Sequence, residues 1–228
     1  LLINDVGELL REQGRLDEAR YAPAAAAAPC SYFATPELQQ RHCMLTFRPP
    51  AIRLPFCRAL FTEALEARRA ALGDSALATL TSLNNLGLLL REQKELPQAR
   101  ALLSEAVTKR RAAQGDRHPE TLTAINNLAA CERAMGNLPA AQALYEECLA
   151  ARREELGAEH PDTLTSINNL AAVYRSQGNT TDAEGLMYEA AATARKVLGP
   201  DHPHTKIFER NHKALAHANR TNPIFTQP

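Results

Sequence analysis

Apolar side chains recur along this chain with the spacing of amphipathic helices. In the stretch TLTSINNLAAVYRSQG (163–178), the apolar positions follow an i, i+3, i+6, i+7, i+10 pattern: Leu164, Ile167, Leu170, Ala171 and Tyr174. Gly178 closes this pattern, as expected of a residue that adopts positive φ at the end of a helix. The next stretch, 180–199, has a second apolar face and also closes at a glycine. The pattern therefore predicts two helices joined into a hairpin.

The hairpin pattern repeats with a period of 42 residues. Four markers keep this step: a pair of asparagines, a glycine after the second helix, a His-Pro pair in the linker, and a threonine that follows the linker. Proline in the linker suits a helix start, where its missing N–H is not needed. Because the four markers share one register, the chain contains a true internal repeat.

Small residues occupy matching places in every repeat, where larger side chains would hold the helices apart. These places are Gly87, Ala129 and Ala171 in the first helices, and Ala99, Ala141 and Ala183 in the second helices. One hairpin cannot bury its apolar faces alone, so consecutive hairpins must stack. The sequence predicts an all-α solenoid of about four hairpins.

This pattern resembles the tetratricopeptide repeat, in the 42-residue version found in kinesin light chains and nephrocystin-3-like proteins. The stretch HPDTLTSINNLAAVYRSQGNTTDAE (160–184) and its copies carry the resemblance. It implies a right-handed superhelical solenoid of stacked antiparallel helix pairs, with the first helices lining the concave face. One departure is Glu132, which stands where other repeats have Leu90 and Tyr174, and we expect looser packing around it.

The first repeat is interrupted. LLREQGRLDEAR (9–20) and LLREQKELPQAR (89–100) are near copies that lie 80 residues apart, which is 42 plus 38. Removing residues 21–58 aligns Arg20 with Arg100 and Ala59 with Ala101. The segment contains six prolines and shows no helical period, so we expect it to be poorly ordered. Two interpretations remain open: a long functional loop, or translated non-coding sequence.

These observations define the expected organisation of the chain. It is a first hairpin (1–20 and 59–78) interrupted by the insertion (21–58), three further repeats (79–120, 121–162 and 163–204), a terminal capping helix (205–219) and a disordered tail (220–228). In the terminal helix, Glu209 and His212 replace the apolar Ile167 and Leu170 of the preceding repeat. An exposed end of the array requires such a change.

Charge and motifs argue against several classes of function. The 26 basic and 26 acidic residues give a net charge of zero, which favours neither nucleic acid nor an anionic membrane. No apolar run approaches the ~20 residues of a membrane span. No phosphate-binding glycine loop, zinc-protease motif or serine-hydrolase motif is present. The linker histidines, His118, His160 and His202, are one repeat apart and are expected to cap loops rather than share a metal. We expect no enzyme, cofactor or metal.

The five cysteines show no CxxC pair and no metal-ligand spacing. Cys131 and Cys148 stand where other repeats have small or apolar residues, so we expect them in the core. A reducing cytoplasm is the expected compartment.

The chain opens with Leu1 inside a helical pattern, and we therefore expect it to be a fragment.

The first helices also carry a polar stripe on the side opposite their apolar face. The candidate peptide-binding residues of this stripe are Asn84, Asn85, Asn126, Asn127, Asn168, Asn169, Arg91, Arg133 and Arg175. Asparagine is a poor helix former, and a carboxamide offers both a donor and an acceptor. It could bind the backbone of an extended peptide, or it could brace the neighbouring hairpin; both remain open for the first asparagine of each pair. The resemblance to kinesin light chains, whose groove asparagines hold cargo peptides, favours the second asparagine as the ligand contact.

The arginines suggest the charge of the ligand. Arg91, Arg133 and Arg175 add one cation per repeat to the stripe, which is either a solvated face or a site for acidic peptides. Arginine doublets at 68–69, 110–111 and 152–153 lie near the ends of second helices instead. There positive charge complements the helix dipole, and we expect a structural role.

The main functional hypothesis is a non-catalytic scaffold that binds an extended, acidic peptide in the concave groove. By resemblance it is a kinesin light chain-like cargo adaptor, although kinesin heavy chain would bind only through upstream sequence. The alternative is a sensor or regulatory region of a larger signalling protein, for example a nucleotide-binding one. The expected partner is a protein or peptide, with neither nucleic acid nor membrane.

Overall fold

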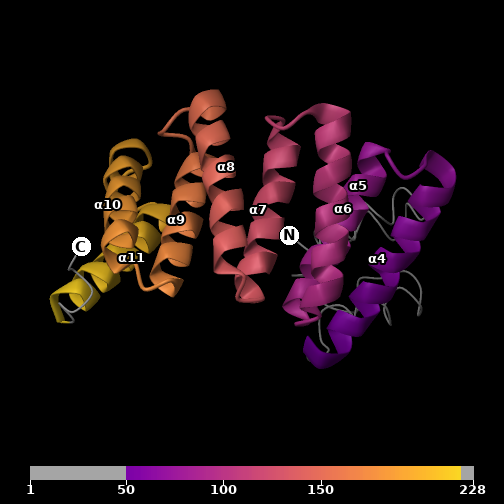
Figure 1. Ribbon diagram of the computed structural model, residues 1–228, viewed down its shortest axis with the longest axis horizontal. Helices are drawn as coiled ribbons and strands as arrows, with labels where there is room; N and C mark the ends of the chain where they lie inside the picture. Colours follow the sequence, from indigo (N-terminus) through magenta and orange to yellow (C-terminus); the bar gives the residue numbers. More distant parts are fainter. Residues whose placement is uncertain (1–49, 222–228) are drawn as a thin grey trace, which may run out of the picture. The chain divides into compact units, whose positions relative to one another are not determined.

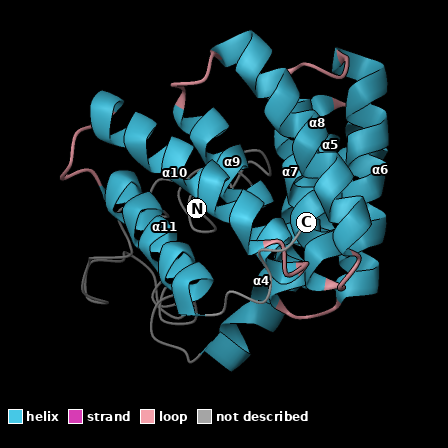
Figure 2. Ribbon diagram, turned by 60° about the vertical axis from the view of Figure 1, so that its left-hand side comes forward, coloured by secondary structure: helices cyan, strands magenta, loops and turns pink. Residues whose placement is uncertain are grey.

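The computed structural model describes residues 50–221, and every regular element in this range is an α-helix (Figure 1). Short loops join the helices, as Figure 2 shows. The described residues fall into two compact units, 50–94 and 95–221. The predicted first helix of the first hairpin (1–20), most of the insertion (21–49) and the end of the tail (222–228) lie outside the described residues.

The first unit is a hairpin of α4 (Pro50–Leu72) and α5 (Leu77–Glu92). The chain reverses at Gly73, whose φ of 85° is readily adopted only by glycine. Phe61 and Leu65 of α4 are buried in this unit, as are Leu80 and Leu83 of α5. These residues lie at helical spacing, so each helix contributes one apolar face to the hairpin.

Helix α4 starts earlier than the repeat pattern indicates. It begins at Pro50, so residues 50–58 are helical and the expectation of irregular structure was wrong for this part of the insertion. A proline at the first position of a helix is favourable, because its missing N–H has no partner to lose. Among the described residues of the segment, Pro50 starts the helix and Pro55 lies within its second turn.

The second unit contains six helices that pack in chain order. They are α6 (Leu96–Gln114), α7 (Pro119–Ala134), α8 (Leu138–Leu156), α9 (Pro161–Ser176), α10 (Thr180–Val197) and α11 (Pro203–Thr221). Each helix contacts the next, and α7 also contacts α9 in the following hairpin. The predicted all-α solenoid is therefore confirmed. Helices α7, α9 and α11 start 42 residues apart, each at a proline.

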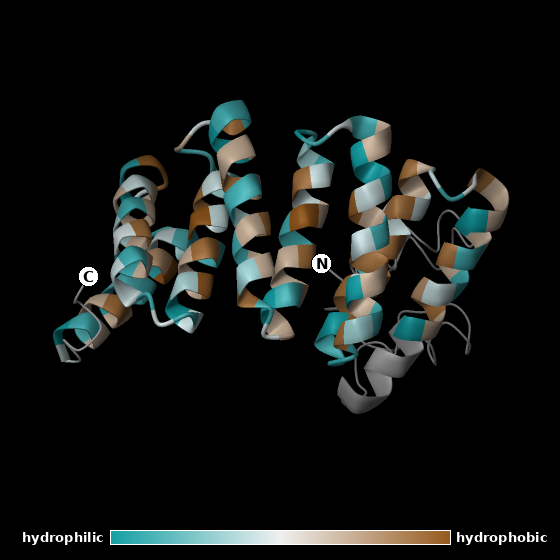
Figure 3. Cartoon of the chain, viewed as in Figure 1, coloured by the Kyte–Doolittle hydropathy of each residue, from teal (hydrophilic) through white to brown (hydrophobic). Residues whose placement is uncertain are grey.

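The core of this unit lies between the helices, which carry hydrophobic and hydrophilic positions in turn (Figure 3). Tyr145, Ile167 and Met187 are among its largest fully buried side chains. The small residues predicted at the helix contacts are buried as well: Ala99, Ala129, Ala141, Ala171 and Ala183. Their size lets neighbouring helix backbones approach closely.

Replacing Ala141 with leucine is expected to lower the free energy of unfolding by about 1–3 kcal/mol, because added methyl groups overpack a filled contact. Ala141 is 0 % exposed. The matched control is Ala192→Leu on α10, since Ala192 is exposed. Thermal or urea denaturation measures both; equal losses would show that Ala141 is not a close helix contact.

The linker histidines cap the starts of the helices that follow them, whereas the sequence predicted only that they cap loops. The Nδ1 atoms of His118, His160 and His202 accept hydrogen bonds from the backbone N–H groups two residues later, at 3.2, 3.1 and 3.2 Å. Each bond satisfies one N–H group that a helix start leaves without a partner. These backbone hydrogen bonds explain why a histidine recurs at this position of the repeat.

The arginine doublets are structural, but helix-dipole complementation accounts for only part of their role. The first arginine reaches the start of the next first helix: Arg152 Nη1 donates to Asp162 O at 3.0 Å and to Ser166 Oγ at 2.9 Å. The second arginine of the doublet binds the next second helix, as in the Arg153–Glu189 pair at 2.6 Å. The 152–153 doublet therefore links consecutive hairpins.

The middle doublet differs because Ala124 stands where Ser166 lies one repeat later. Arg110 Nη1 donates to Gln114 Oε1 at 3.2 Å and lies 3.5 Å from Glu120 Oε2. Burial lowers the pKa of Arg110, while the charge of Glu120 opposes this shift. Arg111 binds Glu147 at 2.6 Å and so keeps the link between second helices.

The expectation of loose packing at Glu132 was wrong. Glu132 is 4 % exposed, and its Oε1 atom lies 2.6 Å from Arg100 Nε. Its other oxygen accepts a hydrogen bond from Asn137 Nδ2 at 2.8 Å. The third repeat thus replaces an apolar contact with a hydrogen-bonded ion pair between α6 and α7.

Candidate peptide-binding face

The polar stripe of the second unit runs along the first helices α7 and α9. Asn126 and Asn127 of α7 are half-buried, as are Asn168 and Asn169 of α9. Arg133 and Arg175, at the ends of these helices, are exposed. The apolar faces of the same helices are buried. The spacing of residues along each helix therefore puts the polar stripe on a different face from the core. In the first unit, Asn84, Asn85 and Arg91 of α5 are half-buried at the matching register.

The asparagines of neighbouring repeats are hydrogen-bonded to one another. Asn169 Nδ2 donates to Asn126 Oδ1 at 2.8 Å, and Asn211 Nδ2 donates to Asn168 Oδ1 at 2.9 Å. In both cases the second asparagine of one repeat binds the first asparagine of the preceding repeat. Bracing between hairpins is therefore present, and it uses both members of the pair. Within α5, Asn84 Nδ2 donates to Asn85 Oδ1 at 3.4 Å.

Each brace leaves polar atoms that a ligand can use. Among residues 50–221, the Asn126 amide nitrogen donates no hydrogen bond and Asn169 Oδ1 accepts none. The same holds for the nitrogen of Asn168 and the oxygen of Asn211. A carboxamide has two N–H donors and an acceptor with two lone pairs. Every braced pair thus presents one oriented donor group and one oriented acceptor.

Asn169→Ala is expected to lower the free energy of unfolding by about 0.5–1.5 kcal/mol, the net contribution of one ordinary hydrogen bond. Thr123→Ala on the exposed stripe of α7 is the control, because the Thr123 hydroxyl binds only Pro119 O within its own helix. Chemical denaturation of the two variants tests this, and equal stabilities would mean that the brace contributes nothing.

The arginines of the stripe differ from Arg111, Arg117 and Arg153, which lie outside it. Arg111, Arg153 and Arg117 pair with acidic residues of the next hairpin at distances of 2.6 Å. The guanidinium groups of Arg133 and Arg175 make no ion pair and no hydrogen bond within residues 50–221. The stripe positions of α7 and α9 contain no acidic residue. The second unit therefore pairs Arg111, Arg117 and Arg153 with acidic residues and leaves the charges of Arg133 and Arg175 available.

Helix α11 extends the stripe with residues that the sequence analysis did not select. Asn211 occupies the register of Asn169, and Arg210 occupies that of Asn168. The 42-residue step was sufficient to find both, but the departure of Glu209 and His212 from the apolar pattern indicated only a cap. Glu209 pairs with Arg195 at 3.0 Å, and His212 lies against Tyr188 with ring centroids 5.5 Å apart.

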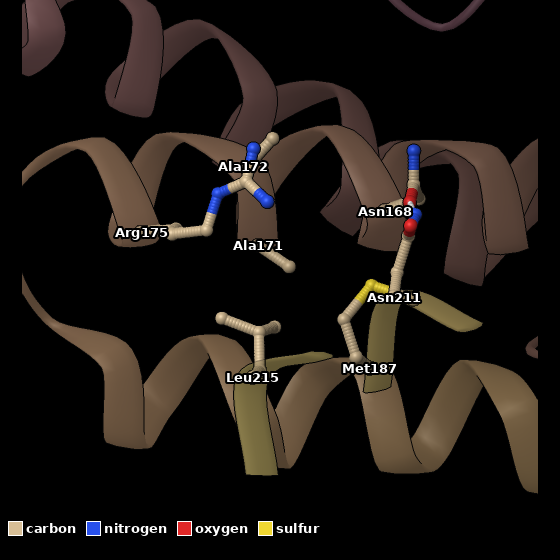
Figure 4. A pocket seen from close by; sticks show the side chains of 7 residues that line it. All are labelled: Asn168, Ala171, Ala172, Arg175, Met187, Asn211 and Leu215. Carbon is tan, nitrogen blue, oxygen red and sulfur yellow. Dashed lines mark hydrogen bonds between the residues drawn. The ribbon is translucent and has the colours of Figure 1, made fainter. Parts of the chain in front are cut away.

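A hollow of about 100 Å³ lies where α9, α10 and α11 meet (Figure 4). Its lining residues are Asn168, Ala171, Ala172, Arg175, Met187, Asn211 and Leu215. Ala171, Met187 and Leu215 are buried and form an apolar floor. Asn168 and Arg175, two of the predicted site residues, stand at its polar edge, so the structure brings them to the same hollow.

Three further features of the described part of the chain bear on function: candidate metal ligands, cysteines and membrane-spanning helices. No group of three or more His, Cys, Asp or Glu side chains within it could hold a metal ion. Cys131 and Cys148 are buried as predicted, and burial raises the pKa of the Cys148 thiol. No described helix is both long and apolar enough to cross a membrane.

Comparisons with known proteins find solved structures with a similar fold. One is a crystal structure from Podosopora anserina, described as "putative kinesin light chain nearly identical TPR-like repeats". Its sequence is 22% identical to this chain, and the TM-score is 0.68, with 85% of this chain and 92% of that chain covered. A variant of it matches at the same identity and TM-score over 76% and 82%. BtubC (BKLC) from P. vanneervenii is 20% identical, with a TM-score of 0.61 over 88% and 81%.

The family comparison covers most of the repeats. No curated protein matches the chain. The model of the tetratricopeptide repeat matches four overlapping segments, at residues 53–112, 90–154, 120–190 and 164–218. The matched segments span the helical hairpins and their linkers. The chain therefore belongs to the tetratricopeptide repeat family.

Proposed function

We propose that this chain is a non-catalytic interaction scaffold that binds an extended, acidic peptide along the polar stripe of its first helices. The observation that carries the proposal is the difference between the two sets of arginines. Arg111 and Arg153 are paired across repeats, whereas Arg133 and Arg175 have no partner within residues 50–221. Arginine binds carboxylates through two parallel N–H···O bonds, so the stripe suits an acidic ligand.

The braced asparagines supply the second part of the recognition. An extended peptide presents alternating C=O and N–H groups along its length. The Asn126–Asn169 pair offers a donor on one residue and an acceptor on the other, with both side chains oriented by their mutual bond. Because the brace orients the groups before binding, less side-chain entropy is lost on forming the complex. Backbone contacts and arginine contacts together favour a linear peptide over a small anion.

The resemblance to kinesin light chain-like repeats supports a role as a cargo adaptor. The braces occur in consecutive repeats, so one peptide could contact more than one hairpin. A cytoplasmic location is part of this proposal, because Cys131 and Cys148 are free thiols in the core. The proposed partner is a protein with an exposed acidic segment.

A panel of peptides tests the proposal on the full chain. Short labelled peptides rich in glutamate are expected to bind, whereas lysine-rich peptides of equal length and free glutamate are not. Binding is expected to weaken as salt rises from about 50 to 500 mM, because exposed charges are screened. Fluorescence anisotropy measures these affinities. Equal binding of acidic and basic peptides would contradict the proposal.

A further inference from the structure

We propose that the hollow between α9, α10 and α11 takes one aliphatic side chain of the bound peptide, while Arg175 binds a carboxylate of a neighbouring peptide residue. This inference rests on the proposed function and adds to it a residue preference. The preferred ligand is an acidic segment that contains leucine, isoleucine or valine next to its acidic residues.

The floor of the hollow is apolar although it opens on the polar stripe. Leu215 of α11 and Met187 of α10 are 4 % and 1 % exposed, and Ala171 of α9 lies beside them. In Figure 4, Leu215 and Ala171 point toward one another across the hollow. A ligand that reached this floor with an apolar group would remove additional apolar surface from water.

The edge of the hollow carries polar groups of the kind that position a peptide. Arg175 is exposed and has no partner within residues 50–221. Asn168 and Asn211 form a brace on the other side, with the nitrogen of Asn168 and the oxygen of Asn211 still available. An apolar floor with a few convergent polar groups is the usual composition of a ligand pocket. The positive charge of Arg175 favours a peptide in which an acidic residue lies next to the aliphatic one.

The size of the hollow limits the side chain it accepts. Its volume is about 100 Å³, whereas a cavity of about 150 Å³ holds a benzene molecule. A branched aliphatic side chain is therefore a better fit than an indole ring.

The register of the repeats supplies a substitution that fills the hollow. Ala172 is half-buried and lines the hollow, and the matching position in α5 is Leu88, which is also half-buried. Leucine is thus compatible with a first helix at this position. Ala130→Leu, the same change one repeat earlier, is the matched control, because Ala130 does not line the hollow.

The test uses short synthetic peptides with a central residue between pairs of glutamates, bound to the full chain. Replacing the central leucine of the peptide with alanine is expected to weaken binding about tenfold, which is the order expected for burying one aliphatic side chain. Ala172→Leu should weaken the leucine peptide about tenfold and leave the alanine peptide unchanged. Ala130→Leu should leave both unchanged, and a tryptophan peptide should bind no better than the alanine peptide.

A second readout reports occupancy of the hollow directly. The chain has three methionines, so methyl-labelled methionine gives three NMR signals, and Met187→Leu identifies the one from the floor. The leucine peptide is expected to shift the Met187 methyl signal, whereas the alanine peptide is not. Circular dichroism of each variant shows whether its helices are intact.

The outcomes separate this inference from the proposed function. If acidic peptides bind and Arg175→Glu weakens them, but leucine and alanine peptides bind equally, the hollow is not a side-chain pocket and the proposed function stands. Equal weakening of both peptides by Ala172→Leu would also overturn the pocket. If no acidic peptide binds the unaltered chain, both proposals fail.

Discussion

Reversing the charge of both stripe arginines, with Arg133→Glu and Arg175→Glu in one chain, is expected to weaken binding of a glutamate-rich peptide about a hundredfold. This corresponds to about 2.7 kcal/mol. Hydrogen bonds to charged groups contribute roughly 1.5–3 kcal/mol each, and reversal adds repulsion between the new glutamates and the ligand. Because the side chains of Arg133 and Arg175 bind no described residue, the melting temperature should stay within a few degrees of the unaltered chain.

The matched control reverses two other arginines, with Arg111→Glu and Arg153→Glu. The change in net charge is the same, but these side chains lie on second helices and pair with Glu147 and Glu189. Peptide affinity is expected to change by less than about threefold, because the remaining effect is the screened charge of the whole protein. If both double variants lost affinity equally, binding would reflect net charge and not the stripe.

Replacing Arg100 with alanine is expected to lower the free energy of unfolding by about 1–3 kcal/mol. Glu132 is buried, and this change removes the positive charge that pairs with its carboxylate. The neutral amide of Asn137 is then the remaining side-chain donor. The Arg100 side chain is 53% exposed, so removing Glu132 instead of Arg100 is expected to have a different effect. Glu132→Leu frees an arginine that water can solvate, and it installs the residue found as Leu90 one repeat earlier. That variant is expected to be as stable as the unaltered chain, or more stable.

Denaturant titration of the two single variants measures this asymmetry. Arg117→Ala serves as the control, since Arg117 forms an exposed ion pair with Glu154, and exposed ion pairs contribute little to stability. Equal destabilisation by Arg100→Ala and Glu132→Leu would show that the pair acts as a net stabilising contact. It would also mean that burial of the carboxylate is not the main cost.

The fold of the second unit could be predicted because it depends on local and periodic features of the sequence. Helical spacing of apolar residues, the glycines between helices and the alanines at helix contacts are local or periodic, so the 42-residue step carries each of them through the chain. The histidine caps also belong to this class, because the donor lies two residues from the ring. Ala141 and Cys148 were placed in the core by comparison with their counterparts in other repeats.

The side-chain pairings could not be obtained in the same way. The Asn169–Asn126 bond joins residues 43 positions apart, and the Arg153–Glu189 pair spans 36. Such pairings depend on the rotation between successive hairpins, which the repeat period does not specify. The ion pair of Glu132 was missed for this reason, since Arg100 lies on the preceding helix. The early start of α4 at Pro50 was missed because a proline-rich composition does not show which proline stands first in a helix.

The central claim is that an acidic peptide lies along the stripe of the first helices, and NMR titration of the full chain tests it most directly. With nitrogen-15 labelling, a glutamate-rich peptide is expected to shift the Nε–H signals of Arg133 and Arg175 and the side-chain amides of Asn126 and Asn168. The Nε–H signals of Arg111 and Arg153 should not move. Shifts confined to Arg111 and Arg153, with the stripe unchanged at saturating peptide, would contradict the claim.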